Sequence, residues 1–141
     1  MLKQILTLTS IALLTACGSQ EPLVKAGSSL QLLSDRFSFT EGPAADAQGN
    51  VYFTDQPNDR IYKWDATTDS LTVFMEGAGR ANGLYFDASG NLLAAADNQS
   101  ELWKISPQKD VQVLVTSYED KRLNGPNDIW IAPNGNLYFT D

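Results

Sequence analysis

Short apolar runs alternate with clusters of glycine, asparagine, aspartate and proline along most of this chain. Runs of this length are typical of β-strands, and the clusters between them are typical of turns. No helical periodicity is sustained beyond the first part of the chain. The pattern therefore predicts an all-β protein of short strands. The predicted strands cover residues 30–33, 41–45, 51–54, 61–64, 71–75, 82–86, 92–96, 101–105 and 111–116, with two more from residue 127 onward.

These strands form a repeat that is marked by Gly-Asn turns beginning at Gly49, Gly90 and Gly135. A short apolar run follows each turn. Successive turns are 41 and 45 residues apart. Repeats of this length, built from short strands, are typical of β-propeller blades. The sequence therefore predicts part of a β-propeller.

The repeat divides residues 30–141 into blades. Blade 1 is expected at residues 41–75, blade 2 at 82–116, and the start of blade 3 at 127–141. The run at residues 30–33 is expected to complete the last blade and so close the ring. Six blades of this size need roughly 250 residues. The chain is thus expected to be a fragment that holds about two and a half blades, with open strand edges that favour aggregation.

A polar residue stands eight positions before each turn glycine, and these residues are Glu41, Asn82 and Asn127. Each begins the first predicted strand of its blade, so the three side chains are expected to form a ring around the central channel. Carboxylate and amide oxygens are the ligands that Ca²⁺ and Mg²⁺ prefer. The ring therefore predicts a site for a hard cation. The alternatives are a solvated carboxylate for Glu41 and turn-forming amides for the two asparagines.

The first residues have the features of a bacterial lipoprotein signal. Residues 1–16 carry Lys3 and then an apolar run that is too short to span a bilayer, as in a secretory signal peptide. Leu-Thr-Ala-Cys at residues 14–17 resembles a lipobox and predicts lipidation of Cys17. Residues 17–29 are interpreted as a tether. The acyl chains would hold the protein in the bacterial cell envelope, on the periplasmic side or at the outer membrane of a Gram-negative cell. The alternative is an ordinary signal peptide with an incidental cysteine.

Composition removes several classes of function. The chain contains no histidine, which excludes Ser-His-Asp triads and HExxH zinc sites. Its formal net charge is −7, and it has no basic stripe, so a nucleic-acid partner is not expected. Cys17 is the only cysteine, so no intrachain disulfide can form. The remaining chemistry is that of carboxylates, amides, basic side chains and a hard metal ion.

Three segments carry a resemblance to a known family: FTEGP at residues 39–43, GNVYFTD at 49–55 and NGPNDI at 124–129. Together they resemble the gluconolactonase/regucalcin family, which includes senescence marker protein and luciferin-regenerating enzyme. The resemblance implies a six-bladed propeller that hydrolyses a sugar lactone or related cyclic ester. It also implies one divalent ion in the channel, often Ca²⁺, with Mg²⁺ and Mn²⁺ left open.

The resemblance implies roles for particular residues. Glu41 matches a metal ligand of the family, and Asn127 matches an asparagine that lies beside the metal and helps to hold water or substrate. The other metal ligands and the general base are expected beyond Asp141. Mammalian members have an arginine at the position of Gly125, so sugar-acid recognition is expected to differ here. Asn82 shares the ring position, and we expect it to contribute to substrate binding.

Other polar and aromatic residues have structural interpretations. Asp128 is expected on the opposite face of its strand from Asn127, bonded to blade backbone. Lys121 and Arg122 are expected to be solvated, with contact to an anionic substrate as the alternative. Second strands end in aspartates that are expected to cap backbone groups, namely Asp55, Asp97 and Asp141. The tryptophans at strand positions, Trp64, Trp103 and Trp130, are expected in the core.

Two functions remain open at this point. One is a lipid-anchored, metal-dependent lactone hydrolase. The other is a non-catalytic propeller that binds a partner or ligand on the same scaffold. Asparagine and aspartate at the ring positions of later blades would favour the enzyme. A strictosidine-synthase-like propeller is disfavoured by the glutamate of the EGP segment.

Overall fold

The computed structural model describes residues 23–141, so Cys17 and the predicted signal peptide lie outside the described residues. Ser34–Asp141 form one compact unit, and residues 23–33 are described by themselves. No helix within the described part is long and apolar enough to cross a membrane. Residues 30–33 form no strand, because a strand needs a hydrogen-bonded neighbour and the predicted neighbour belongs to the last blade. The ring-closing role of this segment stays a prediction.

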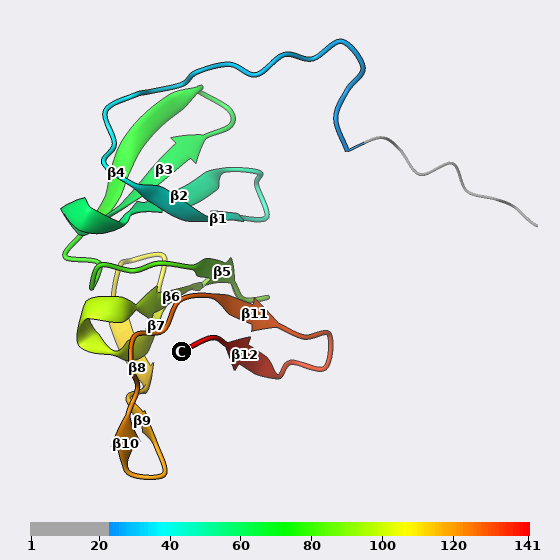
Figure 1. Ribbon diagram of the computed structural model, residues 1–141. Coiled ribbons are helices and arrows are strands. Elements are labelled where there is room, and N and C mark those ends of the chain that lie inside the picture. Colours follow the sequence, from blue (N-terminus) through cyan, green and yellow to red (C-terminus); the bar gives the residue numbers. More distant parts are fainter. Residues whose placement is uncertain (1–22) are drawn as a thin grey trace, which may run out of the picture. The chain divides into compact units, whose positions relative to one another are not determined.

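Blade 1 is a four-stranded antiparallel sheet with its strands in chain order (Figure 1). Its strands are β1 (Thr40–Ala45), β2 (Val51–Asp55), β3 (Arg60–Asp65) and β4 (Ser70–Glu76). A short 3₁₀ helix, η1 (Gln56–Asn58), joins β2 to β3. All four strands were predicted within one residue at each end. Glycine at the Gly49 position suits this turn because its φ is +84°.

Blade 2 repeats the same order and pairing. It consists of β5 (Leu84–Phe86), β6 (Leu92–Ala96), η2 (Asp97–Gln99), β7 (Glu101–Ile105) and β8 (Val111–Val115). The first strand was predicted to begin at Asn82, but it begins at Leu84. The backbone of Asn82 still follows the sheet, because its N–H donates to the carbonyl of Ala95 at 3.0 Å.

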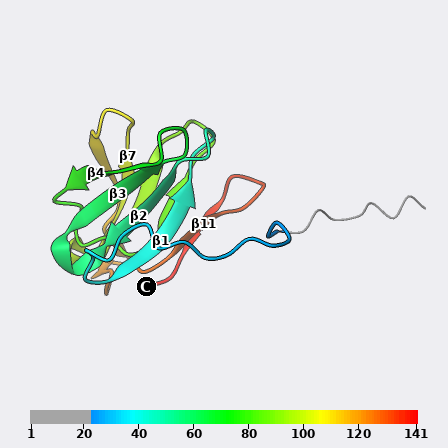
Figure 2. The same ribbon diagram turned by 90° about the horizontal axis from the view of Figure 1, so that it is seen from above.

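The start of blade 3 is the antiparallel pair β11 (Ile129–Ile131) and β12 (Leu137–Phe139). A small hairpin that was not predicted lies between blades 2 and 3 in the chain. It pairs β9 (Ser117–Tyr118) with β10 (Lys121–Arg122), and it projects from the end of β8 in Figure 1. Seen from above, the strands of blade 1 run in order from β4 to β1, and β11 lies on the β1 side (Figure 2). The first strands are thus gathered on one side of the folded unit.

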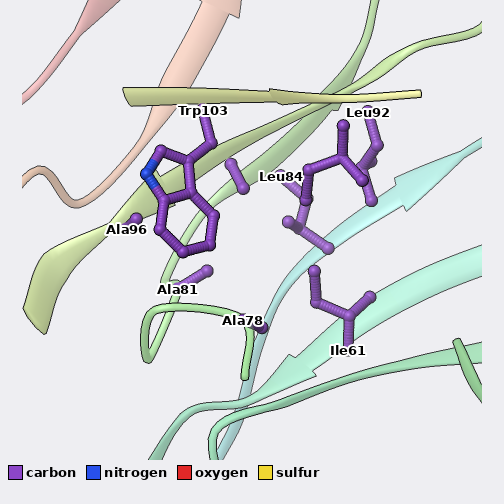
Figure 3. Packing of buried hydrophobic residues seen from close by; sticks show 9 residues of the cluster. Ile61, Ala78, Ala81, Leu84, Leu92, Ala96 and Trp103 are labelled. Atoms are coloured by element: carbon purple, nitrogen blue, oxygen red, sulfur yellow. The ribbon is translucent and has the colours of Figure 1, made fainter. Parts of the chain in front are cut away.

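The blades are joined face to face by apolar side chains. Strand β6 is buried along its whole length. Its side chains point alternately to the two faces of the sheet, and both faces are covered by neighbouring blades. Leu92, Ala94 and Ala96 face blade 1, where they join a cluster with Ile61 and Trp103 (Figure 3). Leu93 and Ala95 face blade 3, where they join Ile129 and partly buried neighbours from β11 and β12.

The tryptophans divide between the core and the surface. Trp103 is 9% exposed and belongs to the core, as predicted. Trp130 is 51% exposed, so the prediction of a core position was wrong for this residue within the described chain. The reason is the alternation along β11, where Ile129 and Ile131 face blade 2 and Trp130 faces the other side. Trp64 is partly buried and donates its indole N–H to Asp69 at 2.9 Å.

Candidate functional site

At one end of each blade, the start of the first strand lies beside the end of the second strand. We call this the ring end because it carries Glu41, Asn82 and Asn127. In blade 1, Thr40 pairs with Asp55. In blade 3, the N–H of Asn127 donates to the carbonyl of Thr140 at 2.9 Å. The short helices η1 and η2 follow the second strands, so they lie at the ring end as well.

Glu41 and Asn127 line the same pocket at the ring end. The pocket has a volume of about 240 Å³ and is also lined by Asp128 and by Gly83. Glu41 lies within β1, and Asn127 lies two residues before β11. The structure therefore brings together two of the three predicted ring residues, which come from blades that are distant in sequence. A carboxylate and a carboxamide that line one pocket can provide oxygen atoms to one ligand.

Glycines allow the ring strands to approach one another closely. A β-carbon on Gly42 would overlap the carbonyl oxygen of Asn82. A β-carbon on Gly83 would lie 2.7 Å from the carbonyl oxygen of Asn127, and the N–H of Gly83 donates to that oxygen at 2.6 Å. In blades 1 and 2, the residue that follows the ring position thus packs on the backbone of the next ring residue. This spacing sets how near the ring side chains come.

Asn82 is placed differently from the other two ring residues. It is only 7% exposed, and its side-chain amide donates to the carbonyl of Pro126 at 3.4 Å. Its own carbonyl accepts a hydrogen bond from the hydroxyl of Thr54 at 3.1 Å. Asn82 therefore joins all three blades, and it is not among the residues that line the pocket with Glu41. A role for Asn82 in substrate binding stays a prediction.

Asp128 also lines the pocket, which sequence reasoning did not anticipate. The prediction that it points away from Asn127 assumed that both residues belong to one extended strand. β11 begins only at Ile129, so strand alternation does not apply to Asp128. Its carboxylate accepts the N–H of Ile129 at 2.9 Å, and a β-carbon on Gly83 would lie 2.6 Å from the same oxygen. The sequence feature that could have identified Asp128 as a pocket residue is its place directly after Asn127, the ring residue of blade 3.

The pocket is electrostatically acidic. Partial burial raises the pKa of the Glu41 carboxyl, and the negative charges of Asp128 and then Asp97 raise this pKa further. A cation in the pocket would act in the opposite direction, because it would favour the ionised carboxylate. Even so, no three histidine, cysteine or acidic side chains are placed to hold a metal ion within residues 23–141.

The comparison with known proteins can now be set beside this geometry. The profile of the SMP-30/Gluconolactonase/LRE-like region matches residues 39–141. The chain belongs to this family. The match begins at the FTEGP segment and includes every residue that lines the pocket of Glu41 and Asn127.

Individual members of the gluconolactonase family are similar to this chain over part of their length. A gluconolactonase of Zymomonas mobilis subsp. mobilis is 26% identical over 137 residues, which cover 86% of this chain and 38% of the relative. A solved structure described as a putative gluconolactonase is 32% identical with a TM-score of 0.77, over 83% of this chain and 41% of that one. A gluconolactonase of Xanthomonas campestris, XC5397, is 29% identical with a TM-score of 0.73, over 77% and 37% of the two chains.

More distant structures are similar in fold alone. A streptogramin B lyase is 20% identical with a TM-score of 0.59 over 72% of this chain. The chain spans about two fifths of the gluconolactonases that it matches.

The predicted capping aspartates of this gluconolactonase-family chain behave in two ways. The carboxylate of Asp55 accepts the backbone N–H groups of Ser38 and Phe39, each at 3.1 Å. Asp141 accepts those of Asn124 and Gly125, at 2.9 and 3.0 Å. The capping prediction is confirmed for these two residues, each of which ties the loop before the first strand to the end of the second strand.

Asp97, the corresponding residue of blade 2, does not follow this pattern. The N–H of Arg80 donates to Asp59 at 2.6 Å, and the N–H of Ala81 donates to the carbonyl of Ala78 at 3.3 Å. Asp97 instead accepts the side-chain amide of Gln56, from blade 1, at 3.3 Å. The prediction that it caps backbone groups was wrong, because the N–H of Arg80, which stands where Phe39 and Gly125 stand in the other blades, donates to Asp59 of blade 1 and leaves this carboxylate for another partner.

Gly125 stands where mammalian members of the family have an arginine, and substrate recognition was predicted to differ for this reason. In the structure, the side chain of Asp97 lies beside Gly125. A β-carbon on Gly125 would overlap a carboxylate oxygen of Asp97. No side chain fits at this position while Asp97 keeps its conformation. Arg122 lies on β10 and donates to the carbonyl of Gln99 at 2.8 Å. It is therefore bonded to the backbone of η2, and it does not line the pocket of Glu41.

Proposed function

We propose that this protein is a metal-dependent hydrolase of a sugar lactone or a related cyclic ester, built on a six-bladed propeller. Membership of the SMP-30/Gluconolactonase/LRE-like family supports the reaction class, and the relatives described as gluconolactonases suggest the substrate class. The observation that carries the proposal is the single pocket shared by Glu41 and Asn127. It gathers the two residues that the family resemblance marks as functional.

The residues of this pocket fit a hard divalent cation. Ca²⁺ binds six to eight oxygen ligands, and Mg²⁺ binds oxygen ligands and water. Glu41 would supply a carboxylate oxygen, and the amide oxygen of Asn127 would lie beside the ion. We propose Ca²⁺ first, with Mg²⁺ and Mn²⁺ as alternatives. Later blades and water would supply the remaining ligands.

A bound divalent ion would polarise the lactone carbonyl and lower the pKa of a water molecule, which is why such a site needs no histidine. The residues of this chain have the supporting roles. Glu41 holds negative charge at the ring, and Asn127 offers an amide that can both donate to and accept from substrate hydroxyl groups. We expect the general base beyond Asp141. Asn82 holds the segment that precedes Asn127 through its bond to Pro126.

The cellular location is a further part of the proposal. We propose that Cys17 is lipidated and that the protein is anchored in the bacterial cell envelope through this group. The supporting observation is the lipobox-like segment at residues 14–17. Cys17→Ser should move the protein from the membrane fraction to the soluble fraction. Membrane association that survives this substitution would contradict lipid anchoring at Cys17.

The decisive experiment is a lactonase assay of the full-length protein with Ca²⁺, Mg²⁺, Mn²⁺ or a chelator. Glu41→Gln keeps the shape of the side chain but removes its charge, and it should lower kcat/KM at least about a hundredfold. Glu76→Gln is the matched control, because Glu76 lies on β4 and forms an exposed ion pair with Arg60. Unchanged turnover in Glu41→Gln would contradict the metal role of Glu41.

The same assay separates the enzyme from the alternative, a propeller that only binds. Calorimetry would show whether the full-length protein binds the divalent ion, and the assay would show whether it turns over a lactone. Ion binding without turnover of any lactone would favour the binding module. Turnover that a chelator abolishes would favour the hydrolase.

A further inference from the structure

The hydroxyl group of Thr54 ties the ring residue of blade 1 to the ring residue of blade 2. It donates to the carbonyl of Glu41 at 3.0 Å and to the carbonyl of Asn82 at 3.1 Å. A hydroxyl group carries one proton, so the two carbonyls share it in a three-centre hydrogen bond. Thr54 is fully buried, where a hydrogen bond is electrostatically stronger than in water. The bond therefore fixes the backbone of both ring residues.

The strand that bears Glu41 is irregular at this point. In the pairing of β1 with β2, Glu41 lies opposite Thr54 and Ala44 lies opposite Tyr52. Three steps along β1 thus match two steps along β2, which makes a β-bulge directly after Glu41. A bulge disrupts the hydrogen-bonded ladder and re-aims side chains, often beside functional sites. The ladder alone does not fix the direction of Glu41 here, and the bond from Thr54 adds a constraint.

The position of Thr54 is occupied differently in the three blades. It is the fifth residue after each turn glycine, which is Thr54 in blade 1, Ala95 in blade 2 and Thr140 in blade 3. The hydroxyl oxygen of Thr140 accepts the backbone N–H of Asp128 at 3.0 Å. The ring residue lines the pocket in the two blades with threonine, whereas Asn82, from the blade with alanine, does not. A buried or bonded hydroxyl thus accompanies the ring positions that line the pocket.

The bond from Thr54 is also the first link between the two ring residues that line the pocket. It joins Glu41 to the backbone of Asn82. The next residue, Gly83, donates its N–H to the carbonyl of Asn127 at 2.6 Å. A path of hydrogen bonds therefore runs from the ring residue of blade 1 through blade 2 to that of blade 3.

We propose that Thr54 is a positioning residue, which holds Glu41 in the place that the divalent ion of the proposed hydrolase requires. This inference rests on the proposed function and adds a residue that touches neither the ion nor the substrate. Thr54 is buried and does not line the pocket, so it acts through Glu41. Groups that hold metal ligands in place typically contribute about ten- to a hundredfold to metal affinity.

A pair of substitutions isolates the hydroxyl group. Thr54→Ser keeps the hydroxyl and loses the methyl group, whereas Thr54→Ala loses both, so the two variants differ by one oxygen atom. Blade 2 has alanine at this position, so the blade fold accommodates it. Thr54→Val keeps the shape without the hydroxyl and is a second variant. Thr72→Ala is the matched control, because Thr72 also donates to a backbone carbonyl, that of Lys63, but lies on the outer strand β4.

Calorimetry of the full-length protein with Ca²⁺ measures the effect on the ion site. Thr54→Ser should bind the ion with a dissociation constant close to that of wild type. Thr54→Ala and Thr54→Val should bind it at least about tenfold more weakly, and Thr72→Ala should bind like wild type. Denaturant unfolding of the same variants measures stability. A residue that only stabilises the fold would lower the free energy of unfolding and leave the ion affinity unchanged.

Three calorimetric results would overturn the proposal. The first is an unchanged ion affinity in Thr54→Ala and Thr54→Val. The second is an equal loss in Thr54→Ser and Thr54→Ala, which would assign the effect to the methyl group. The third is an equal loss in Thr72→Ala.

A wild-type protein that binds no divalent ion would contradict the metal dependence of the proposed function by itself. Crystal structures of the ion-free wild type, Thr54→Ser and Thr54→Ala then decide the role of Thr54. The Glu41 carboxylate should be displaced by at least about 0.5 Å in Thr54→Ala alone, a shift that is enough to spoil a ligand site. A carboxylate that keeps its place in Thr54→Ala would overturn the positioning role.

Discussion

The backbone of Gly42 packs so closely on the carbonyl of Asn82 that no side chain has room at position 42. This contact joins the ring residue of blade 2 to the residue that follows Glu41. The φ angle of Gly42 is +57°, which is costly for residues with a β-carbon. The glycine of the EGP segment is thus required by conformation and by space. It determines how near Glu41 lies to the next blade.

Gly42→Ala should destabilise the full-length protein by at least about 2 kcal/mol, since left-handed backbone alone costs about 1–2 kcal/mol. The overlap with Asn82 adds to that cost. Gly49→Ala is the control, because Gly49 also has positive φ but has open space around it. Denaturant unfolding followed by fluorescence would measure the free energy of unfolding of both variants. Equal effects of the two substitutions would contradict the importance of the contact between blades.

Asp55 should make the protein sensitive to acid. It is fully buried. Burial alone would raise its pKa, but hydrogen bonds from Asn58, Phe39 and Ser38 outweigh this effect and lower the pKa. A carboxyl group whose pKa is lower in the folded state stabilises the fold above its unfolded-state pKa of about 3.9. That contribution is lost as the pH falls from this value toward the folded-state pKa.

Asp55→Asn should therefore destabilise the protein by about 3 kcal/mol at neutral pH, since hydrogen bonds to charged groups are worth about 1.5–3 kcal/mol each. Its free energy of unfolding should also depend less on pH below about pH 4 than that of wild type. Asp35→Asn, in an exposed loop, serves as the control. Identical pH profiles for wild type and Asp55→Asn would show that this carboxylate contributes nothing to acid sensitivity.

The strands were predictable because short apolar runs and the turn residues between them repeat with the blade. β6, for example, was predicted at its observed bounds, since an apolar run between a Gly-Asn turn and a polar loop has one straightforward interpretation. The ring position of Glu41 and Asn127 followed from the same repeat. What the repeat could not show was a departure from it. Asp97 occupies a repeated position but bonds to another blade, because the N–H of Arg80 in the loop before β5 donates to Asp59 of blade 1 instead.

Short elements were missed for a related reason. The hairpin of β9 and β10 has two residues in each strand, including polar and charged ones, and carries no apolar alternation. Asp128 was assigned to the wrong face because the start of β11 could not be located to one residue. Side chains alternate between two faces only within a strand, so alternation does not predict the direction of a residue that lies just before the strand begins. Site residues next to a boundary therefore need coordinates.

The metal-free protein should show a raised pKa for Glu41. Partial burial is the larger cause, followed by the charges of Asp128 and Asp97. Asp128→Asn removes one of these charges, so the pKa of Glu41 should fall toward its ordinary value in this variant. NMR titration of the Glu41 carboxyl carbon in chelator-treated protein would measure this pKa in wild type and in Asp128→Asn. Asp110→Asn should leave the titration unchanged, and a Glu41 pKa that does not respond to Asp128→Asn would contradict the arrangement of the pocket.

Trp130 and Tyr138 form an exposed apolar surface on the pair of β11 and β12. They are cross-strand neighbours with ring centroids 5.6 Å apart, and they are 51% and 53% exposed. The corresponding tyrosine of blade 1, Tyr52, packs edge-on against Phe86 of blade 2 at 5.0 Å. Trp130 and Tyr138 thus have the positions that join a blade to its neighbour.

The 141-residue chain, expressed by itself, should therefore self-associate through this surface. The double substitution Trp130→Ser with Tyr138→Ser removes the two large rings and should shift the chain toward monomer in sedimentation velocity. Val73→Ser is the control, because Val73 is also exposed but lies on β4, the outer strand of blade 1. Self-association that persists in the double variant would assign it to the open strand edges instead, since those edges keep their backbone donors and acceptors whatever side chains they carry.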